Sequence, residues 1–371
     1  MRKNSLVAVA GLSVAALGLA ACGSSSSGGG GTGASASSSG KAAYVGVILP
    51  DTASSSRWEN NDRPYLEAAF KAAGVKYDIQ NAQGDKAKFQ TIADGMLNEG
   101  VNVLMIVNLD SPTGAAVESK AKAQGVATID YDRLTLGGTR DYYVSFDNVA
   151  VGTAEGTGLV KCMQALGKKS GNVVELNGSP TDNNATLFKQ GYDKVIRGAG
   201  YKVVADQAVP NWDNTQAGTI FEQIFAAQKG AIDGVDAAND GLGGAVVSVL
   251  ARNGLAGKVP VTGQDATDPG LQRVLLGTQC VTVYKAIKKE ADAASALAIA
   301  LAKGDKQQAD ALATGTVQDS TSNQPVKSVL LTPVGIYPAT VKDVVADGFT
   351  TAAKLCTTAQ LKAACTKYGV S

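Results

Sequence analysis

The sequence predicts an α/β protein with two open, doubly wound parallel sheets that are joined by crossing strands. Strand-like and helix-like segments alternate at a spacing of roughly 25–30 residues, which is the pattern of βαβ units. One of these segments, 101–107 (VNVLMIV), is apolar at every position, as in a parallel strand that is buried on both faces. The alternation pauses at 142–150 and then restarts, which indicates a second sheet.

The first sheet is expected to begin with the apolar run 44–49 (YVGVIL). A helix follows, for which we expect Asp62 as the N-cap and Pro64 in the first turn, because proline is tolerated where no N–H partner is needed. Further strands are expected at 75–80, 101–107 and 126–130, and further helices at Asp85 and Ser111.

The second sheet is expected to take its strands from 171–176, 201–206, 232–238, 259–263 and 280–285, with helices between them. A long alanine-rich helix at 286–303, an extended segment at 328–337 and a mostly helical tail complete the chain. In open α/β sheets, ligands bind outside the carboxyl ends of the strands, so the residues directly after each strand are the candidates for a site.

The N-terminal segment is typical of a bacterial lipoprotein. Arg2 and Lys3 precede a short apolar run, which ends in the tetrad Leu-Ala-Ala-Cys at 19–22. We expect a signal peptide over 1–21, lipidation at Cys22, and a flexible Gly/Ser-rich tether over 22–41. The alternative is an ordinary signal peptide with an incidental cysteine. Either leader predicts a folded body outside a membrane.

The composition excludes several classes of function. The chain contains no histidine, so it has no Ser-His or Cys-His nucleophilic site and no metal site that uses His. We expect no catalytic residue, no metal and no cofactor. Without Arg2 and Lys3 the 34 basic residues fall to 32 against 33 acidic ones, a net charge of −1 that predicts no nucleic-acid partner.

Two patterns in the sequence could suggest an enzyme, but neither is specific. Asp130 with Asp132, and Asp265 with Asp268, have a spacing that a glycosidase pair could use, but salt-bridged or N-capping clusters have the same spacing. The glycine cluster at 241–244 lacks the third glycine of a dinucleotide-binding fingerprint, and there is no P-loop sequence.

Four cysteines follow Cys22, an even number that favours disulfides in an exported protein. Three connectivities are possible. Cys356 and Cys365 bracket a short segment and are the obvious local pair, which leaves Cys162 with Cys280 as the long-range pair. Free buried thiols are the alternative.

Polar and aromatic side chains of one chemistry follow the predicted strands. They comprise Arg57, Trp58, Asp132, Arg133, Asp147, Asn148, Asp182, Asn183, Asn184, Trp212, Asn239, Asp240, Gln264, Asp265 and Lys285. A sugar needs carboxylates and amides for its hydroxyls, Arg and Lys as further donors, and flat aromatic rings for its C–H faces. Each Asp or Asn alone could equally be an N-cap or a turn residue. Together with both tryptophans of the chain, they predict a monosaccharide pocket.

The same motifs, in the same order, resemble a known family. SRW (56–58), YDR (131–133), SFDN (145–148), GSPTDNNA (178–185), TGQDA (262–266) and TVYK (282–285) look like the D-xylose-binding proteins of bacterial ABC transporters. They also resemble the related multiple-sugar-binding proteins, which handle glucose and galactose. The similarity spans about residues 44 to 350.

The resemblance implies a type I periplasmic-binding-protein fold, with two Rossmann-like lobes and a three-segment hinge that includes Asp147 and Asn148. One lobe would comprise 42–146 with 286–331, the other 147–285 with 332–371. The implied sugar contacts are Arg57, Trp58, Asp132, Arg133, Asn183, Asn184, Trp212, Asn239, Asp265 and Lys285, with Asp132 orienting Arg133.

The resemblance also implies a function without catalysis. The lobes would close on a monosaccharide, most of all D-xylose, and the closed form would be recognised by an ABC permease. We expect a monomer that is lipid-anchored at Cys22 on the outer face of a cell membrane, as in Gram-positive bacteria. Alternatives are a receptor for glucose- or galactose-type aldoses and a sugar sensor for a signalling receptor. A repressor would need an N-terminal helix-turn-helix in place of the leader.

Overall fold

The first strand, β1 (Tyr44–Leu49), has alternate residues in two different cores. Val45 and Val47 are buried in the same core as Leu66 and Leu297, whereas Ile48 is buried in the same core as Phe89. Successive side chains of a strand point to opposite faces, so β1 is covered by helices on both sides. This is the fully buried parallel strand that its apolar sequence predicts.

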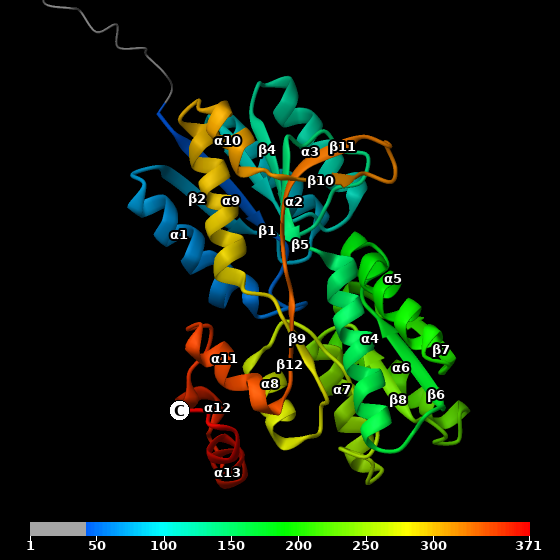
Figure 1. The fold of residues 1–371 in the computed structure, drawn as a ribbon. Coiled ribbons are helices and arrows are strands. Elements are labelled where there is room, and N and C mark those ends of the chain that lie inside the picture. The colour runs from blue at the N-terminus through cyan, green and yellow to red at the C-terminus, as the bar shows by residue number, and fades with distance from the viewer. Residues whose placement is uncertain (1–41) are drawn as a thin grey trace, which may run out of the picture. The chain divides into compact units, whose positions relative to one another are not determined.

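The structure is a computed structural model that describes residues 42–371 (Figure 1). The predicted signal peptide, the lipidation site Cys22 and the tether lie outside the described residues. No helix in the described part of the chain is long and apolar enough to span a membrane.

The first lobe is built on a seven-stranded sheet with the order β10-β11-β5-β4-β3-β1-β2. Its strands are β1, β2 (Lys76–Asn81), β3 (Val103–Ile106), β4 (Ala127–Tyr131), β5 (Tyr142–Phe146), β10 (Gly315–Gln318) and β11 (Pro325–Leu331). Its helices are α1 (Arg63–Ala72), α2 (Lys86–Asn98), α3 (Ser111–Ala123), α9 (Ile287–Ala302) and α10 (Lys306–Leu312). All neighbouring strands pair in parallel except β10 and β11.

The second lobe is built on a three-stranded parallel sheet with the order β7-β6-β8 and on an antiparallel pair, β9 with β12. Its strands are β6 (Asn172–Asn177), β7 (Lys202–Ala208), β8 (Gly234–Ala237), β9 (Thr282–Tyr284) and β12 (Val334–Ile336). Its helices are α4 (Asn148–Ala165), α5 (Asn183–Gly198), α6 (Asn214–Ala227), α7 (Asp240–Arg252), α8 (Asp268–Leu276), α11 (Val341–Ala346), α12 (Ala352–Leu355) and α13 (Ala359–Tyr368).

The chain crosses between the lobes three times (Figure 1). The crossings lie between β5 and α4, between β9 and α9, and between β11 and β12. Asp147 caps α4 at the first crossing, where its side chain accepts from the Ala150 N–H at 2.9 Å. Strands β1 and β4 of the first lobe and β6 and β8 of the second are each followed by predicted site residues.

Two expectations from the sequence are wrong, and one strand was not expected. Segment 259–263 forms only isolated bridges, such as Val235 with Val261, because Pro260 has no N–H to give to a ladder. The edge strand β10 was not anticipated from its short, polar sequence. Asp62 is not an N-cap: it has helical backbone angles and makes no capping bond, since a π-helical turn, Trp58–Asp62, already precedes α1.

Helices α4 and α5 approach each other closely through glycines. A Cβ atom on Gly152 of α4 would lie 1.8 Å from the carbonyl oxygen of Phe188 of α5. A Cβ atom on Gly191 of α5 would lie 2.3 Å from the carbonyl oxygen of Val149. Only glycine permits this backbone separation, and it fixes the position of α5 and the side chains that α5 carries.

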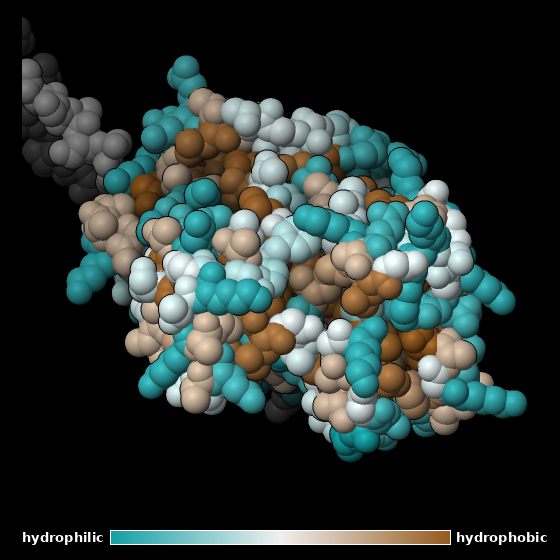
Figure 2. Space-filling model, turned by 60° about the horizontal axis from the view of Figure 1, so that its bottom comes forward, coloured by the Kyte–Doolittle hydropathy of each residue, from teal (hydrophilic) through white to brown (hydrophobic). Residues whose placement is uncertain are grey.

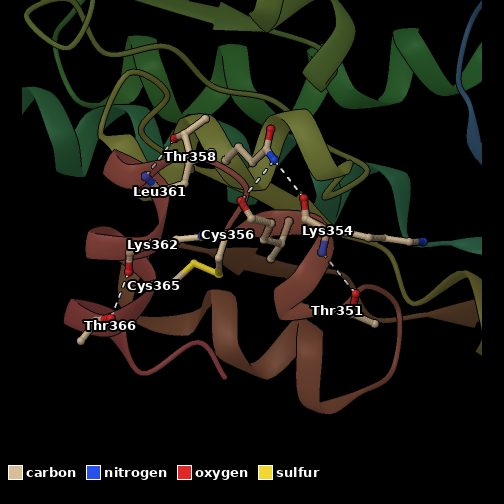
Figure 3. Close-up of a disulfide and its surroundings, with 10 residues drawn as sticks. Thr351, Lys354, Cys356, Thr358, Leu361, Lys362, Cys365 and Thr366 are labelled. Atoms are coloured by element: carbon tan, nitrogen blue, oxygen red, sulfur yellow. Dashed lines mark hydrogen bonds between the residues drawn. A yellow bond between two sulfur atoms is a disulfide. The ribbon is translucent and has the colours of Figure 1, made fainter.

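Both disulfides of the described chain lie within the second lobe. Cys162 of α4 is bonded to Cys280, which precedes β9, and Cys356 is bonded to Cys365 of α13. Figure 3 shows the second bond between the two short tail helices. Thr351 and Thr358 cap these helices, accepting from the backbone N–H groups of Lys354 and Leu361. The tail shares a hydrophobic core with α8. Gln272 of α8 also donates from its Nε2 to the Lys354 carbonyl at 3.0 Å.

Removing the Cys162–Cys280 bond is expected to cost more stability than removing the Cys356–Cys365 bond. The sequence separations are 118 and 9, and loop closure removes more entropy from the unfolded chain when the loop is long. We expect losses of about 4–5 and about 3 kcal/mol for the two double Cys→Ala variants. Urea unfolding of both variants measures this. Equal losses would show that loop length does not govern the effect.

The surface carries no single large hydrophobic patch in the view of Figure 2, where brown residues form several small groups between teal and white ones. The large hydrophobic side chains that are exposed come from different elements: Val149, Leu166, Leu276, Leu312, Leu330 and Val334. Single exposed hydrophobic side chains of this kind are ordinary on the surface of a folded protein.

Candidate functional site

A cavity of about 320 Å³ lies between the two lobes at the carboxyl ends of their strands. Its wall combines polar groups with three aromatic rings. The lining residues are Ser54, Ser55, Arg57, Trp58, Asp132, Arg133, Asp182, Asn184, Phe188, Trp212, Asn239, Gln264, Asp265 and Lys285. The structure therefore brings together every predicted sugar contact except Asn183, which begins α5 and does not line this cavity.

Arg57 is held by carboxylates on three sides. Its Nε and Nη2 donate to the two oxygens of Asp62 at 2.9 and 2.8 Å, and Nη2 also donates to Glu290 Oε2 at 2.6 Å. Its Nη1 donates to Asp132 Oδ2 at 2.7 Å. All four side chains are buried. These bonds fix the orientation of the Arg57 guanidinium at the cavity wall.

The expectation that Asp132 orients Arg133 is wrong. Asp132 forms its ion pair with Arg57, and its Oδ1 accepts from Nδ2 of Asn184 at 3.1 Å. Arg133 instead lies 2.9 Å from Asp182 Oδ2, and its Nη1 donates to the Asn108 carbonyl at 3.2 Å. Asp132 and Arg133 are adjacent in the chain, but their side chains contact different partners.

The two tryptophans lie on opposite lobes and are both buried, with exposures of 2% for Trp58 and 5% for Trp212. The Arg57 guanidinium lies 4.4 Å from the centre of the Trp58 ring, and Trp58 Nε1 donates to Ser54 at 3.2 Å. Trp212 Nε1 donates to Asp182 Oδ2 at 3.2 Å. Each indole N–H is therefore satisfied by protein, so a ligand would meet the aromatic surface of each ring rather than its N–H.

The Trp212 ring rests on Gly178, the residue after β6. A Cβ atom on Gly178 would lie 2.0 Å from the indole ring, so no larger residue fits beneath it. Trp212 itself has a left-handed backbone, with a φ of 56°. Strained backbone is often kept where a side chain must be aimed at a site.

Asn184 of α5 connects the second lobe to the first. Its Nδ2 donates to both the carbonyl and the carboxylate of Asp132, at 3.0 and 3.1 Å. Its Oδ1 accepts from Asn148 Nδ2 at 2.9 Å, and Asn148 lies at the crossing between β5 and α4. One predicted hinge residue thus contacts a cavity residue directly.

Further polar contacts join the lobes around the cavity. Ser55 donates to Asp265 at 3.4 Å, and Asn239 Nδ2 donates to the Ser54 carbonyl at 3.5 Å. Together with Arg133–Asp182 and Asn184–Asp132, these contacts close the first lobe onto the second.

Lys285 supplies a third buried cation, 3.0 Å from Asp265 Oδ1. Burial alone would lower the pKa of Lys285, but the charges of Asp265 and Asp132 raise it above its usual value. Burial alone would raise the pKa of Asp132, but Arg57, Lys285 and Arg133 hold it below its usual value. The amine is therefore a charged donor and the Asp132 carboxylate a charged acceptor at neutral pH.

Among the lining residues, Ser54, Ser55, Asp182, Phe188 and Gln264 were not proposed as contacts from the sequence. Asp182 and Gln264 do follow strands, and Ser54 and Ser55 lie three and two residues before Arg57 in the chain. Phe188 had a different signal: it lies four residues after Asn184 on α5, which places both on one helix face.

Comparison with known proteins identifies the chain's family. Residues 45–306 match the family described as "Periplasmic binding protein domain". The chain belongs to this family of periplasmic binding proteins. The predicted type I fold is confirmed, and because the family consists of solute-binding proteins, this periplasmic binding protein is not an enzyme.

Relatives of this periplasmic binding protein include the D-xylose-binding periplasmic protein of Escherichia coli (strain K12). The two are 34% identical over 314 residues, which cover 83% of this chain and 91% of that protein. The multiple sugar-binding periplasmic receptor of Rhizobium radiobacter is 29% identical over 325 residues, 82% of this chain and 89% of that protein. A solved ABC transporter solute-binding protein from Clostridium phytofermentans, with bound β-D-glucose, has a TM-score of 0.76 and 26% identity, covering 84% of this chain and 99% of that one.

Proposed function

We propose that this periplasmic binding protein is the receptor of an ABC sugar importer and that it binds a monosaccharide. Among the aldoses, D-xylose is the ligand that we propose first. The observation that carries the proposal is the cavity itself, in which Trp58 and Trp212 come from opposite lobes with charged donors and acceptors between them. The names of its relatives, a D-xylose-binding protein among them, support the same ligand class.

The size and chemistry of the cavity favour a single sugar ring. The cavity is small: its empty space, counted together with its opening to solvent, is about 320 Å³. Indole faces cover the C–H patches of a pyranose, while Lys285, Arg133 and the remaining N–H of Arg57 Nη1 donate to its oxygens. Asp265 and Asn239 offer acceptors for its hydroxyls.

Closure of the lobes is the proposed mechanism. The lobes are assigned to 42–146 with 286–331 and to 147–285 with 332–371, with Asp147 and Asn148 in the hinge. A ligand that contacts both lobes binds the closed form better than the open one and shifts the population toward it. The permease would then recognise a surface that only the closed form presents.

We further propose that the receptor is a monomer tethered to the outer face of a cell membrane, in a Gram-positive bacterium. This part rests on the sequence alone: the leader over 1–21, Cys22 and the Gly/Ser-rich segment 22–41. The two disulfides support an oxidising compartment. Mass spectrometry of Cys22 from membranes of the native host tests for the lipid.

Isothermal titration calorimetry with D-xylose, D-glucose, D-galactose and L-arabinose tests the function. We expect a dissociation constant of about 1 μM or below for the correct aldose. The acyclic alditol xylitol is the matched control, since it has the hydroxyls of xylose without the ring faces, and it should bind at least about tenfold more weakly. Preference for glucose or galactose would move the receptor to the multiple-sugar class. Binding of no aldose at millimolar concentration would overturn the proposal.

A further inference from the structure

Two of the carboxylates that hold Arg57 do not line the cavity. Asp62 and Glu290 are both 0% exposed and lie behind the guanidinium, whereas Asp132 lies in front of it and lines the cavity wall. Neither Asp62 nor Glu290 is therefore placed to touch a ligand. Each acts on the site only through Arg57.

The bonds to these carboxylates leave Arg57 little freedom. A guanidinium has five N–H groups in a fixed plane. Asp62 takes two of them in a bidentate pair, Glu290 takes a third, and Asp132 takes a fourth. One N–H on Nη1 is left without a partner among the described residues. The planar fork fixes the direction of that last N–H once the other four are held.

Neutralising Arg57 does not require three carboxylates. One buried partner would balance the charge, and each additional buried carboxylate costs desolvation energy. The cost is visible at Glu290: burial raises its pKa to about 8 despite the nearby Arg57, and its Oε1 has no hydrogen-bond partner in the described chain. The stability of the fold alone therefore does not explain why position 290 carries a carboxyl group and not an apolar side chain.

The position of Glu290 in the chain offers an explanation. It lies on the first turns of α9, directly after the crossing that begins at the cavity residue Lys285. Asp62 is fixed from another side, since Tyr131 of β4 donates to its Oδ1 at 2.5 Å. The two carboxylates thus tie Arg57 to α9 and to β4, the strand that leads to Asp132.

We propose that Asp62 and Glu290 are positioning residues, which hold the Arg57 guanidinium in the plane that aims its one free N–H at the bound sugar. This inference rests on the proposed function. The charged and titratable groups that face Glu290 are Arg57, Asp62, Asp132, Lys285, Tyr131 and Tyr143. Burial raises the pKa of Glu290 to about 8, so a titration between about pH 6 and pH 9 spans its ionisation.

The test is calorimetric titration with D-xylose, or with whichever aldose the wild-type chain binds, between about pH 6 and pH 9. Ionised Glu290 holds Arg57 more firmly than the neutral acid does, so wild-type affinity should rise by about tenfold as Glu290 ionises. Glu290→Gln resembles the neutral acid in shape and charge. It should match wild type within about twofold near pH 6 and bind about tenfold more weakly near pH 9.

Asp292→Asn is the matched control, because Asp292 lies on the same helix, is 51% exposed and pairs with Lys288 at the surface. It should follow the wild-type profile. A second variant, Asp62→Asn, removes the bidentate partner of Arg57 and should lose about tenfold in affinity at every pH. Thermal unfolding without ligand accompanies each titration.

The outcomes separate the two proposals. If wild type binds no aldose, the proposed function fails and this inference fails with it. If wild type binds an aldose but Glu290→Gln shows the wild-type pH profile, the proposed role of Glu290 is overturned. If Glu290→Gln loses affinity equally at every pH together with melting temperature, Glu290 has a merely structural role, and the inference is again overturned.

Discussion

Replacing Trp212 with alanine is expected to weaken binding of the sugar by at least about two orders of magnitude. The substitution removes the ring face on the second-lobe wall of the cavity and the Nε1–H donated to Asp182, the partner of Arg133 across the lobes. Buried aromatic anchors of this kind commonly contribute about 2–4 kcal/mol, so we expect an affinity loss of at least about 100-fold. Calorimetry with the preferred aldose measures it.

The same variant should remain folded. Trp212 is 5% exposed and packs on Gly178, so its removal is expected to lower the free energy of unfolding by about 3 kcal/mol. Trp212→Phe is the control, because it keeps a ring face and loses only the Nε1–H; it should recover part of the affinity. Unchanged affinity in a folded Trp212→Ala protein would remove Trp212 from the site.

Replacing Gly152 with valine is expected to prevent folding of the second lobe. The new Cβ would lie 1.8 Å from the Phe188 carbonyl oxygen, and backbone cannot move aside as a flexible side chain can. Helices α4 and α5 would have to separate, and the expected loss of stability exceeds about 5 kcal/mol. Urea unfolding, or the yield of soluble protein if no folded state remains, measures the effect.

Gly218 of α6 provides the control for this helical glycine. A Cβ atom there would meet only Ala245, at 4.0 Å, so Gly218→Ala has room for its methyl group. Alanine is the better helix former, and this variant should gain about 0.5–1 kcal/mol. A folded Gly152→Val protein of wild-type stability would show that the two helices can separate freely.

The sequence predicts the wall of the cavity well because strand ends converge. Parallel strands bring their carboxyl ends to one edge of a sheet, so residues as distant in the chain as Arg57, Asn184 and Lys285 could be grouped before their contacts were known. The apolar residues of α2 likewise recur at helical spacing, and Phe89, Ile92 and Met96 are buried together on one face.

The sequence does not predict which charges pair. Arg57 meets Glu290, which is 233 residues away, and Asp132 turns from Arg133 to Arg57, because these contacts depend on how elements distant in sequence pack together. Local geometry was missed for a similar reason. The π-helical turn at Trp58 places an aromatic side chain and the Arg57 guanidinium on the cavity, and no pattern in the sequence predicts this turn.

The bond between Cys162 and Cys280 has a consequence for movement. It joins α4, which follows the first crossing, to the segment before β9, which leads into the second. Two of the three connections to the first lobe are therefore linked to each other covalently within the second lobe. If the lobes open and close as proposed, rotation about the crossings would carry most of the movement. One angle would describe how far this receptor is open, and spin labels placed on the two lobes could follow it.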